Sequence, residues 1–206
     1  KPVICSKQYG HEDILARAIA QACIYTLPPD SSKPRIDVDN IRTARLLGGS
    51  VDQTHMMPGM VLMNLPQNNV LHVENAKVLV LNCGLEASSS ETKGTVLIQS
   101  AEELLTFTRN EEEAFGKEIE AIAKTGVNVI FAGGSISEIS RHYLNQYNIM
   151  GVSIGSKFDL RRICKTLNAS ALVRVGPPTA EEIGECSAID VQEVGGKKVI
   201  VIRQEG

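Results

Sequence analysis

The chain has 206 residues, of which 43% are apolar and 22% charged, so it can bury a core in one large domain or two small ones. Its net charge of −3 gives no electrostatic reason to expect nucleic acid or an anionic membrane as a partner, and no apolar run approaches the roughly 20 residues of a membrane span. The five cysteines and four histidines are scattered without a C-x-x-C motif, which argues against a metal site and favours reduced thiols in the cytoplasm. Both ends lie within sequence that looks structured, so we expect a fragment of a longer protein.

The first part of the chain predicts one helix followed by loops. Residues 11–26 place apolar side chains at helical spacing, and the prolines that follow end the helix. Residues 36–47 fit a strand or a helix equally well, and a pair of glycines interrupts the pattern after them. We therefore expect a boundary near this point, with residues 1–55 and 56–206 in different domains.

The middle of the chain mixes strands with helices. Three apolar runs are strand-like: residues 59–65, 77–83 and 95–98. Two capping boxes follow, one at Ser100 with Glu103 and one at Asn110 with Glu113. They predict two successive helices.

A regular alternation of strands and helices begins at residue 127. Its elements are predicted at residues 127–132, 135–147, 149–154, 156–167 and 171–175. Such a βαβαβ run predicts an α/β fold with a partly parallel sheet covered by helices. Two last strands, 188–194 and 197–203, flank Gly195-Gly196, a turn that favours a hairpin.

The pair Gly133-Gly134 stands where a strand meets a helix, the position of many phosphate-binding loops. However, no third glycine opens the helix and no G-K-[ST] motif follows, so both nucleotide fingerprints are incomplete. We interpret the pair as a structural turn that aims the helix.

The predicted helix 135–147 has two distinct faces. Its apolar stripe consists of Ile136, Ile139, Tyr143 and Tyr147. Its polar strip consists of Glu138, Arg141, His142, Asn145 and Gln146. The strip fits an ordinary solvated face or a surface that recognises a partner, and helical periodicity does not separate the two.

Two charged clusters are interpreted as solvated surface. Arg161, Arg162 and Lys165 lie close together on one predicted helix, but acidic runs elsewhere balance them. Asp37 and Asp39 are two residues apart and are interpreted as a solubilising pair at the edge of a loop.

Several long stretches resemble the group II chaperonins, the ring-forming folding machines of archaea and the eukaryotic cytosol. "VDNIRTARLLGGSVDQTHMMPGMVL" is similar to that family's passage from intermediate to apical domain. "VENAKVLVLNCGLEASSSETKGTVLI" resembles its apical strands leading into a helical protrusion, and "EEEAFGKEIEAIAKTGVNVIFAGGSISEISRHYLNQYNIMGV" resembles the two helices that line the ring opening. The resemblance covers essentially the whole chain.

The resemblance implies a fold and a domain organisation. Residues 56–206 are expected to form an apical, substrate-binding domain in which mixed β-sheets are flanked by helices, with a helical protrusion near 95–115. Residues 1–55 are expected to form a small α+β segment of an intermediate domain.

The resemblance also implies roles for particular residues. The polar strip would form a groove for unfolded protein together with a loop near 64–72. The loop residues are Asn64, Gln67, Asn68 and Asn69. The protrusion would act as a built-in lid whose residues include Leu97, Ile98, Leu104, Leu105 and Phe107. Lys7 resembles the lysine of the family's nucleotide-sensing loop.

The implied function is that of a subunit of an ATP-driven chaperone in the cytoplasm. Its partners would be unfolded proteins such as actin and tubulin, and other subunits in a hetero-oligomeric double ring. The full-length subunit would use ATP and Mg²⁺ and be an ATPase. This chain lacks the G-D-G-T-T nucleotide loop and ends before the family's catalytic aspartate, so we expect no catalytic or metal-binding residue and no bound cofactor in it.

The polar character of the groove predicts selective recognition of particular folding intermediates, because mismatched polar groups are costly to desolvate. Two alternatives remain open. One is a nucleotide-dependent enzyme built on the βαβαβ run, and the other is an adaptor with an α/β core that binds folded partners.

Overall fold

The computed structural model describes residues 1–27, 35–86 and 101–204, and for residues 101–111 it describes the backbone alone. Its helices, with η marking 3-10 turns, are α1 (Pro2–Cys5), α2 (Glu12–Tyr25), η1 (Val38–Asn40), η2 (Val51–Gln53), α3 (Ala101–Lys124), α4 (Glu138–Gln146) and α5 (Lys157–Leu167). Its strands are β1 (Gly59–Leu62), β2 (His72–Leu81), β3 (Val129–Ala132), β4 (Met150–Ser153), β5 (Ala171–Leu172), β6 (Gly184–Val194) and β7 (Lys197–Arg203).

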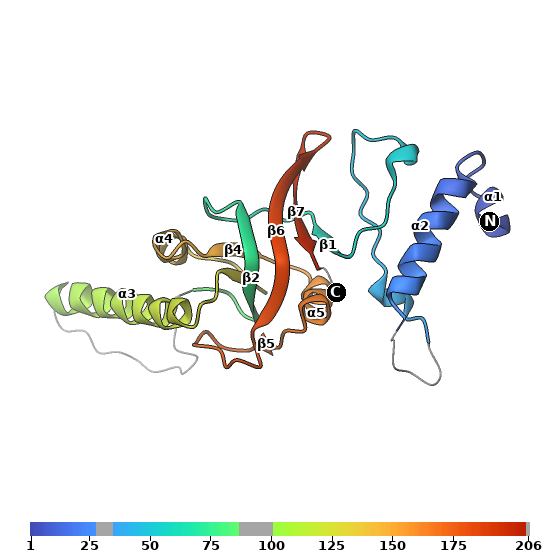
Figure 1. Ribbon diagram of the computed structural model, residues 1–206. Coiled ribbons are helices and arrows are strands. Elements are labelled where there is room, and N and C mark those ends of the chain that lie inside the picture. Colours follow the sequence, from blue (N-terminus) through green and yellow to red (C-terminus); the bar gives the residue numbers. More distant parts are fainter. Residues whose placement is uncertain (28–34, 87–100, 205–206) are drawn as a thin grey trace.

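The strands form one mixed sheet in the order β1-β7-β6-β2-β3-β4, with β5 beside β2 (Figure 1). The strands β3 and β4 are parallel, as the βαβαβ run from residue 127 predicted. The third strand of that run, β5, is parallel to β2, and β2 is itself parallel to β3. The strands β6, β7 and β1 add antiparallel pairs, so the expected mixed sheets are joined in a single sheet.

Both faces of this sheet are covered by helices. Successive residues of β2 point to opposite faces, so that Val78 and Val80 join one buried cluster while Leu79 and Leu81 join another. The helix α5 covers the first cluster with Leu160, Ile163 and Leu167. The second cluster lies under α3 and α4, which supply Phe115, Ile119, Ile122 and Leu144. This two-sided burial explains why the central strands read as continuous apolar runs.

The helix α3 corrects the prediction of two successive helices. It runs without a break through Asn110, where the second capping box was placed. Residues on both sides of Asn110 are mostly Glu, Ala, Leu and Lys, whose helix propensity sustains one long helix, and a cap forms only where the chain leaves the helix. The predicted strand 95–98 and the first cap, Ser100, lie outside the described residues. In Figure 1 the amino-terminal end of α3 projects beyond the edge of the sheet.

The Gly133-Gly134 turn is held by close backbone packing. A Cβ atom on Gly133 would lie 3.1 Å from the carbonyl oxygen of Leu81, and one on Gly134 would lie 2.9 Å from the Cα of Gly84. The helix does not open at this turn: residues after it pair with Leu85, and α4 begins only at Glu138. Backbone contact at the ends of neighbouring strands therefore accounts for both glycines.

The predicted β6–β7 hairpin is confirmed, and its turn contacts the amino-terminal part of the chain. Gly195 and Gly196 have φ angles of +60° and +76°, as the favoured two-residue hairpin turn requires. A Cβ atom on Gly195 would lie 1.6 Å from the carbonyl oxygen of Leu47, so only glycine allows this approach.

The amino-terminal part differs from the rest in its burial. Among the described residues, none before Met60 is buried, and Figure 1 shows α1 and α2 standing beside the sheet rather than on it. Besides the hairpin contact, one hydrogen bond joins α2 to the body, from the Tyr25 hydroxyl to the Gln204 carbonyl at 3.2 Å. The division into domains at residues 1–55 and 56–206 stays a prediction.

The segment around η1 is joined to α5 by polar contacts. Lys165 Nζ lies 3.4 Å from Asp37 Oδ2 and 3.2 Å from Asn40 Oδ1. Arg162 Nε donates to the backbone carbonyl of Asp39 at 3.4 Å. Asp37, Asp39, Arg161 and Lys165 are exposed, as their interpretation as solvated surface predicted, and the fold additionally brings Lys165 beside Asp37.

Candidate functional site

The helix α4 is fixed by its two ends and by one buried face. Ser137 caps its amino terminus, because its hydroxyl accepts a hydrogen bond from the Ser140 backbone N–H at 3.2 Å. The fully buried positions are Ser140 and Leu144, and the Ser140 hydroxyl donates to the carbonyl of Leu85. The helix is therefore held at a fixed orientation on the sheet.

The sequence-predicted apolar stripe packs against this core, but its centre lies elsewhere. Ile136 is buried, whereas Ile139, Tyr143 and Tyr147 are half-buried around it. The stripe followed Ile139, Tyr143 and Tyr147, so it passed over Ser140 and Leu144 on the adjacent row of the helix. A helical wheel that followed the i, i+4, i+8 row from Ile136 would have found the buried centre.

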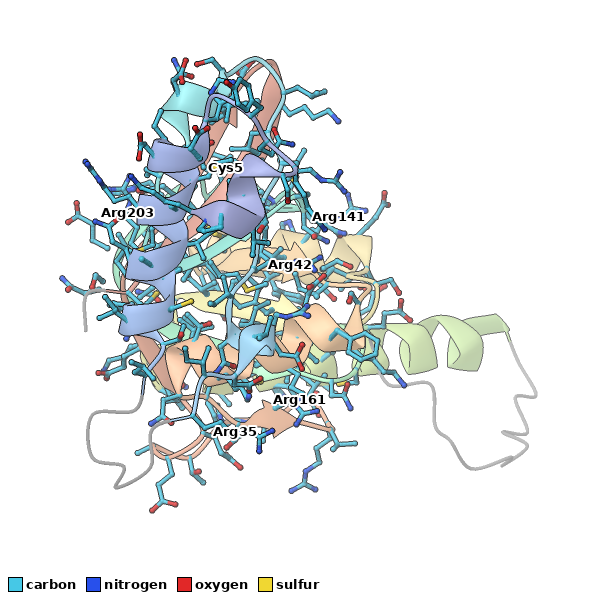
Figure 2. The ribbon with its side chains drawn as sticks, turned by 90° about the vertical axis from the view of Figure 1, so that its right-hand side faces the viewer. Cys5, Arg35, Arg42, Arg141, Arg161 and Arg203 are labelled. Atoms are coloured by element: carbon cyan, nitrogen blue, oxygen red, sulfur yellow. The ribbon has the colours of Figure 1, made fainter. Side chains whose placement is uncertain are left out.

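The predicted polar strip faces outward. Glu138, His142, Asn145 and Gln146 are exposed, and Arg141 is half-buried. An Nη2 atom of Arg141 lies 3.7 Å from Glu138 Oε1, and its Nε atom is buried without a hydrogen-bond partner in the described part of the chain. Figure 2 shows Arg141 on a part of the surface away from Arg161 and Arg35.

The loop predicted to contribute to the same site runs antiparallel along the edge strand β4. Pro66 pairs with Val152, and the backbone N–H of Gln67 donates to the Gly151 carbonyl at 2.9 Å. Two side chains reinforce this pairing: Asn64 donates to the Ser153 carbonyl at 2.7 Å, and Asn68 bonds to the backbone of β4. The loop therefore continues the sheet beyond β4.

The loop and the strip meet at one hydrogen bond. The backbone N–H of Asn69 donates to Asn145 Oδ1 at 3.2 Å, although the two residues are 76 positions apart. The structure thus brings together the two sets of residues that the sequence analysis assigned to one groove. Within the loop, Gln67 and Asn69 are exposed, whereas Asn64 and Asn68 face β4 and their amides bond to its backbone.

Two exposed residues of this surface were missed. Met63 and Leu65 are 50% and 48% exposed, on either side of the inward-facing Asn64. Sequence reasoning placed residues 59–65 in a strand and therefore did not consider which of its side chains face solvent. The strand β1 ends at Leu62, three residues earlier than predicted.

The other predicted residues were assigned to the lid and to nucleotide sensing. Lys7 is exposed in the turn that follows α1. Leu104, Leu105 and Phe107 lie on the helical backbone of α3, and Leu97 and Ile98 lie outside the described residues.

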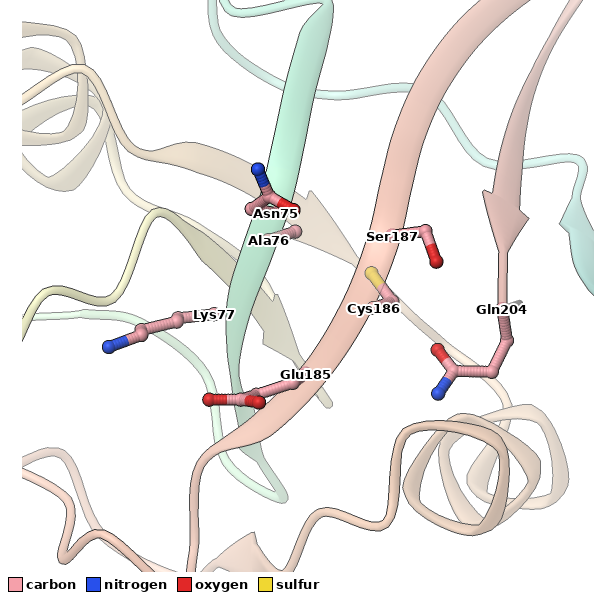
Figure 3. A pocket seen from close by; sticks show the side chains of 7 residues that line it. All are labelled: Asn75, Ala76, Lys77, Glu185, Cys186, Ser187 and Gln204. Carbon is pink, nitrogen blue, oxygen red and sulfur yellow. The ribbon is translucent and has the colours of Figure 1, made fainter. Parts of the chain in front are cut away.

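A shallow pocket between β2 and β6 offers little chemistry (Figure 3). Lys77 and Glu185, which are opposite each other in the strand register, project beside the pocket, and Cys186 on β6 lies opposite Ala76 on β2. Burial raises the pKa of the Cys186 thiol to about 11, so the thiol stays protonated and weakly nucleophilic at neutral pH. All five cysteines of the chain are described, and all are free.

In the part of the chain that the structure describes, no group of three or more His, Cys, Asp or Glu side chains could hold a metal ion. None of the described helices combines the length and apolarity needed to cross a membrane.

One cluster of titratable side chains lies on the sheet away from α4. His72 Nδ1 bonds to Asp190 across the β2–β6 pair, and His72 Nε2 lies 3.3 Å from Glu74 Oε1. These carboxylates, with Asp190 the stronger influence, raise the pKa of His72 above its ordinary value. The cluster pairs charges across strands and is separate from the α4 surface.

The chain was compared with known proteins. The model of the TCP-1/cpn60 chaperonin family matches residues 1–206. The chain is 45% identical over 202 residues to T-complex protein 1 subunit theta of Bos taurus and of Homo sapiens, and 40% identical over 201 residues to the probable theta subunit of Schizosaccharomyces pombe. Each alignment covers 98% of this chain but 36% of the relative, so the chain spans about a third of these relatives' length.

A solved structure has the same fold. The open-state monomer of a group II chaperonin from Methanococcoides burtonii superposes with a TM-score of 0.72, covering 96% of this chain and 44% of that one at 22% sequence identity. The family match over the whole chain and the identity to the theta subunits confirm the resemblance found in the sequence. The chain belongs to the TCP-1/cpn60 chaperonin family.

Proposed function

We propose that this chain is the polypeptide-binding part of a chaperonin subunit, and that α4 and the loop at residues 64–69 hold unfolded protein. One observation carries the proposal: the Asn69–Asn145 hydrogen bond joins the loop to the exposed face of α4 and makes them one continuous surface. Family membership supports it, because it gives the chain a fold used by ring-forming chaperones.

The surface offers hydrogen-bond groups that match an unfolded backbone. Such a chain exposes peptide N–H and C=O groups that native proteins have already paired. The amides of Gln67 and Gln146 are exposed and have both donors and acceptors, and the Arg141 guanidinium has five donors. A folded protein presents few free partners for these groups, so the surface discriminates in favour of unfolded segments.

Selectivity follows from the same chemistry. A polar group that is buried in the complex without a partner costs free energy, so a segment with the wrong pattern of donors and acceptors binds weakly. We therefore infer that the surface binds particular folding intermediates. As the resemblance to chaperonins implies, we propose that actin and tubulin are among its substrates.

Asn64 and Asn68 have a positioning role in this proposal. Their amides hold the loop against β4, so they act on substrate through the place of Gln67 and Asn69. Replacing them is expected to loosen the loop instead of removing a substrate contact.

ATP and Mg²⁺ are proposed to bind elsewhere in the longer polypeptide. The residues present do not fit a nucleotide site, because Gly133 and Gly134 are occupied by close backbone packing and the described residues hold no metal-ligating cluster. In the complete subunit, Lys7 would sense the nucleotide.

The wider assembly is also a proposal. We infer that the complete subunit joins others in a hetero-oligomeric double ring in the cytoplasm. The projecting end of α3, with Leu104, Leu105 and Phe107, would belong to the lid.

The test is capture of actin by this chain. Guanidine-unfolded actin, diluted into buffer, is presented to the immobilised wild-type chain and to an Arg141→Ala/Asn145→Ala variant, with native actin as the second arm. We expect the wild-type chain to retain unfolded actin and the double variant to retain several-fold less. The matched control is Arg161→Ala/Gln21→Ala, which removes an exposed arginine and an exposed amide from α5 and α2.

The outcomes separate the proposals. Equal capture by the wild-type chain and the α4 variant would show that the polar strip is solvated surface. Equal capture of native and unfolded actin would indicate an adaptor for folded partners. Unchanged melting temperatures are required of both variants.

A further inference from the structure

The segment between β1 and β2 has an alternating pattern of exposure. From residue 63 to residue 71, odd-numbered residues are exposed and even-numbered residues are half-buried. The inward positions include Asn64, Pro66 and Asn68, all of which bond or pair with β4. The segment therefore presents one side to the sheet and the other to solvent.

The outward side is mixed apolar and polar. Its members are Met63, Leu65, Gln67, Asn69 and Leu71. None of these side chains carries a charge, and the three apolar ones are 50%, 48% and 53% exposed. The backbone bends at Met63 and again over residues 67–69, and Leu65 lies between Asn64, which donates to the Ser153 carbonyl, and Pro66, which pairs with Val152.

We propose that Met63 and Leu65 are apolar contact residues of the polypeptide-binding surface, and that its preferred occupant is an extended, uncharged segment with apolar side chains at alternate positions. This inference rests on the proposed function and names the class of segment bound. The sequence analysis expected a purely polar groove, whereas in this inference apolar contacts lie next to the polar ones.

Spacing favours an extended occupant. Side chains that share one face of an extended backbone repeat about every 6.5–7 Å, and Met63 and Leu65 are two residues apart on one side of the loop. An extended segment lying along the loop repeats its own side chains at the same interval, so it can place apolar groups on both residues.

Charge favours an uncharged occupant. A charged side chain placed on the row of outward residues would lose water without gaining an opposite charge, because the row supplies only apolar and amide groups. The continuity of the loop with α4 through Asn69 and Asn145 lets the same segment reach the polar strip.

The test uses short fluorescent peptides and the 206-residue chain. One peptide carries leucine at alternate positions among serine and glutamine, the second replaces each leucine by serine, and the third replaces the serines by aspartate. Fluorescence anisotropy is measured with the wild-type chain, with Met63→Ser/Leu65→Ser, and with the matched control Val173→Ser. Val173 is 78% exposed and follows β5, which pairs with β2, so that β2 and β3 separate it from β4.

We expect the wild-type chain to bind the leucine peptide about tenfold more tightly than either other peptide, as partial burial of two apolar side chains predicts. The Met63→Ser/Leu65→Ser variant should lose that preference, and the Val173→Ser variant should keep it. Both variants should also melt like the wild-type chain, because the replaced side chains are largely exposed.

The contradicting outcomes are distinct. If unfolded actin is captured in a manner sensitive to Arg141 and Asn145, but Met63→Ser/Leu65→Ser leaves peptide preference unchanged, this inference fails and the proposed function stands. If the wild-type chain binds neither unfolded actin nor any peptide, both fail. If the variant only abolishes concentration-dependent self-association in sedimentation, the apolar residues belong to a contact between copies, and the inference is overturned.

Discussion

The amino-terminal part of the chain and the sheet that follows it differ in how far their apolar side chains are buried. From Met60 onward, two apolar clusters lie on the two faces of one sheet, and their central residues have no exposed surface. Among the described residues before Met60, none is buried, although Ile19, Ile24 and Tyr25 on α2 are apolar. The comparison shows that an amphipathic pattern predicts a helix but does not predict what the helix packs against.

The exposed apolar residues of these two parts of the chain also differ in what supports them. On α2, exposed apolar residues lie on a helix without a core of its own. Beside β4, Met63 and Leu65 are exposed on a loop whose other side is bonded to the sheet. A rigid support under exposed residues is what a binding surface needs, because less freedom is lost when a partner binds.

The largest expected effect compares one substitution in both parts. Ile130→Ala removes a side chain that is 0% exposed, whereas Ile19→Ala removes one that is 52% exposed. We expect Ile130→Ala to lower the free energy of unfolding by about 2–5 kcal/mol, since it leaves a cavity in the sheet core. We expect Ile19→Ala to lower it by less than about 1 kcal/mol. Urea denaturation followed by circular dichroism measures both, and equal losses would contradict the account.

A smaller effect is expected at the amino-terminal cap of α4. Ser137→Ala removes the hydroxyl that accepts the Ser140 N–H, and should cost about 1 kcal/mol of stability. The matched change is His11→Ala at the start of α2, where the side chain makes no cap hydrogen bond and a smaller loss is expected. Thermal unfolding measures both variants. An equal loss of stability at both positions would show that the hydrogen bond to the Ser137 hydroxyl does not stabilise the helix.

The charged link between η1 and α5 should contribute less. Lys165→Met removes an ion pair with Asp37 whose side chains are both about half exposed, and such pairs contribute roughly 0–1 kcal/mol. We expect faster amide exchange in residues 37–41 and little change in global stability, with Arg161→Met as the control. Raising the salt concentration should reproduce the effect in the wild-type chain. Exchange that does not respond to either change would exclude an electrostatic attachment.

The smallest effect concerns pH. Asp190 and then Glu74 raise the pKa of His72, so the protonated imidazolium is favoured in the folded state. The resulting stabilisation is fully present below the unfolded pKa of about 6.5 and is lost as pH rises through the higher folded pKa. An NMR titration should show a raised pKa for His72 in the wild-type chain. In the Asp190→Asn variant, the pKa of His72 should be lower than in the wild-type chain. Identical midpoints would refute the pairing.

The sequence predicted the sheet region well because its strands are buried on both faces. Continuous apolar runs and the Gly195-Gly196 turn each identify an element locally, and the alternation of elements indicates a parallel arrangement. The long helix α3 was predicted as two because capping motifs occur inside helices as well as at their ends. Single-sequence patterns cannot tell these cases apart.

The candidate site was predicted in part. Helical periodicity separated the outward face of α4, but the loop residues came only from the resemblance to chaperonins. Which loop side chains face β4 depends on Asn64 and Asn68 bonding to a strand about 85 residues away in the sequence. Contacts of that kind are set by the tertiary fold, so local patterns did not reveal them or the exposure of Met63 and Leu65.

The central claim is that unfolded polypeptide binds at α4 and its loop and not at the exposed apolar residues of α2. Hydrogen–deuterium exchange of this chain, with and without guanidine-unfolded actin diluted into buffer, tests it most directly. The account predicts slower exchange in residues 63–71 and 138–147 when actin is bound, with α2 unchanged. Slower exchange confined to α2, or actin binding that leaves both α4 and the loop unchanged, would contradict it.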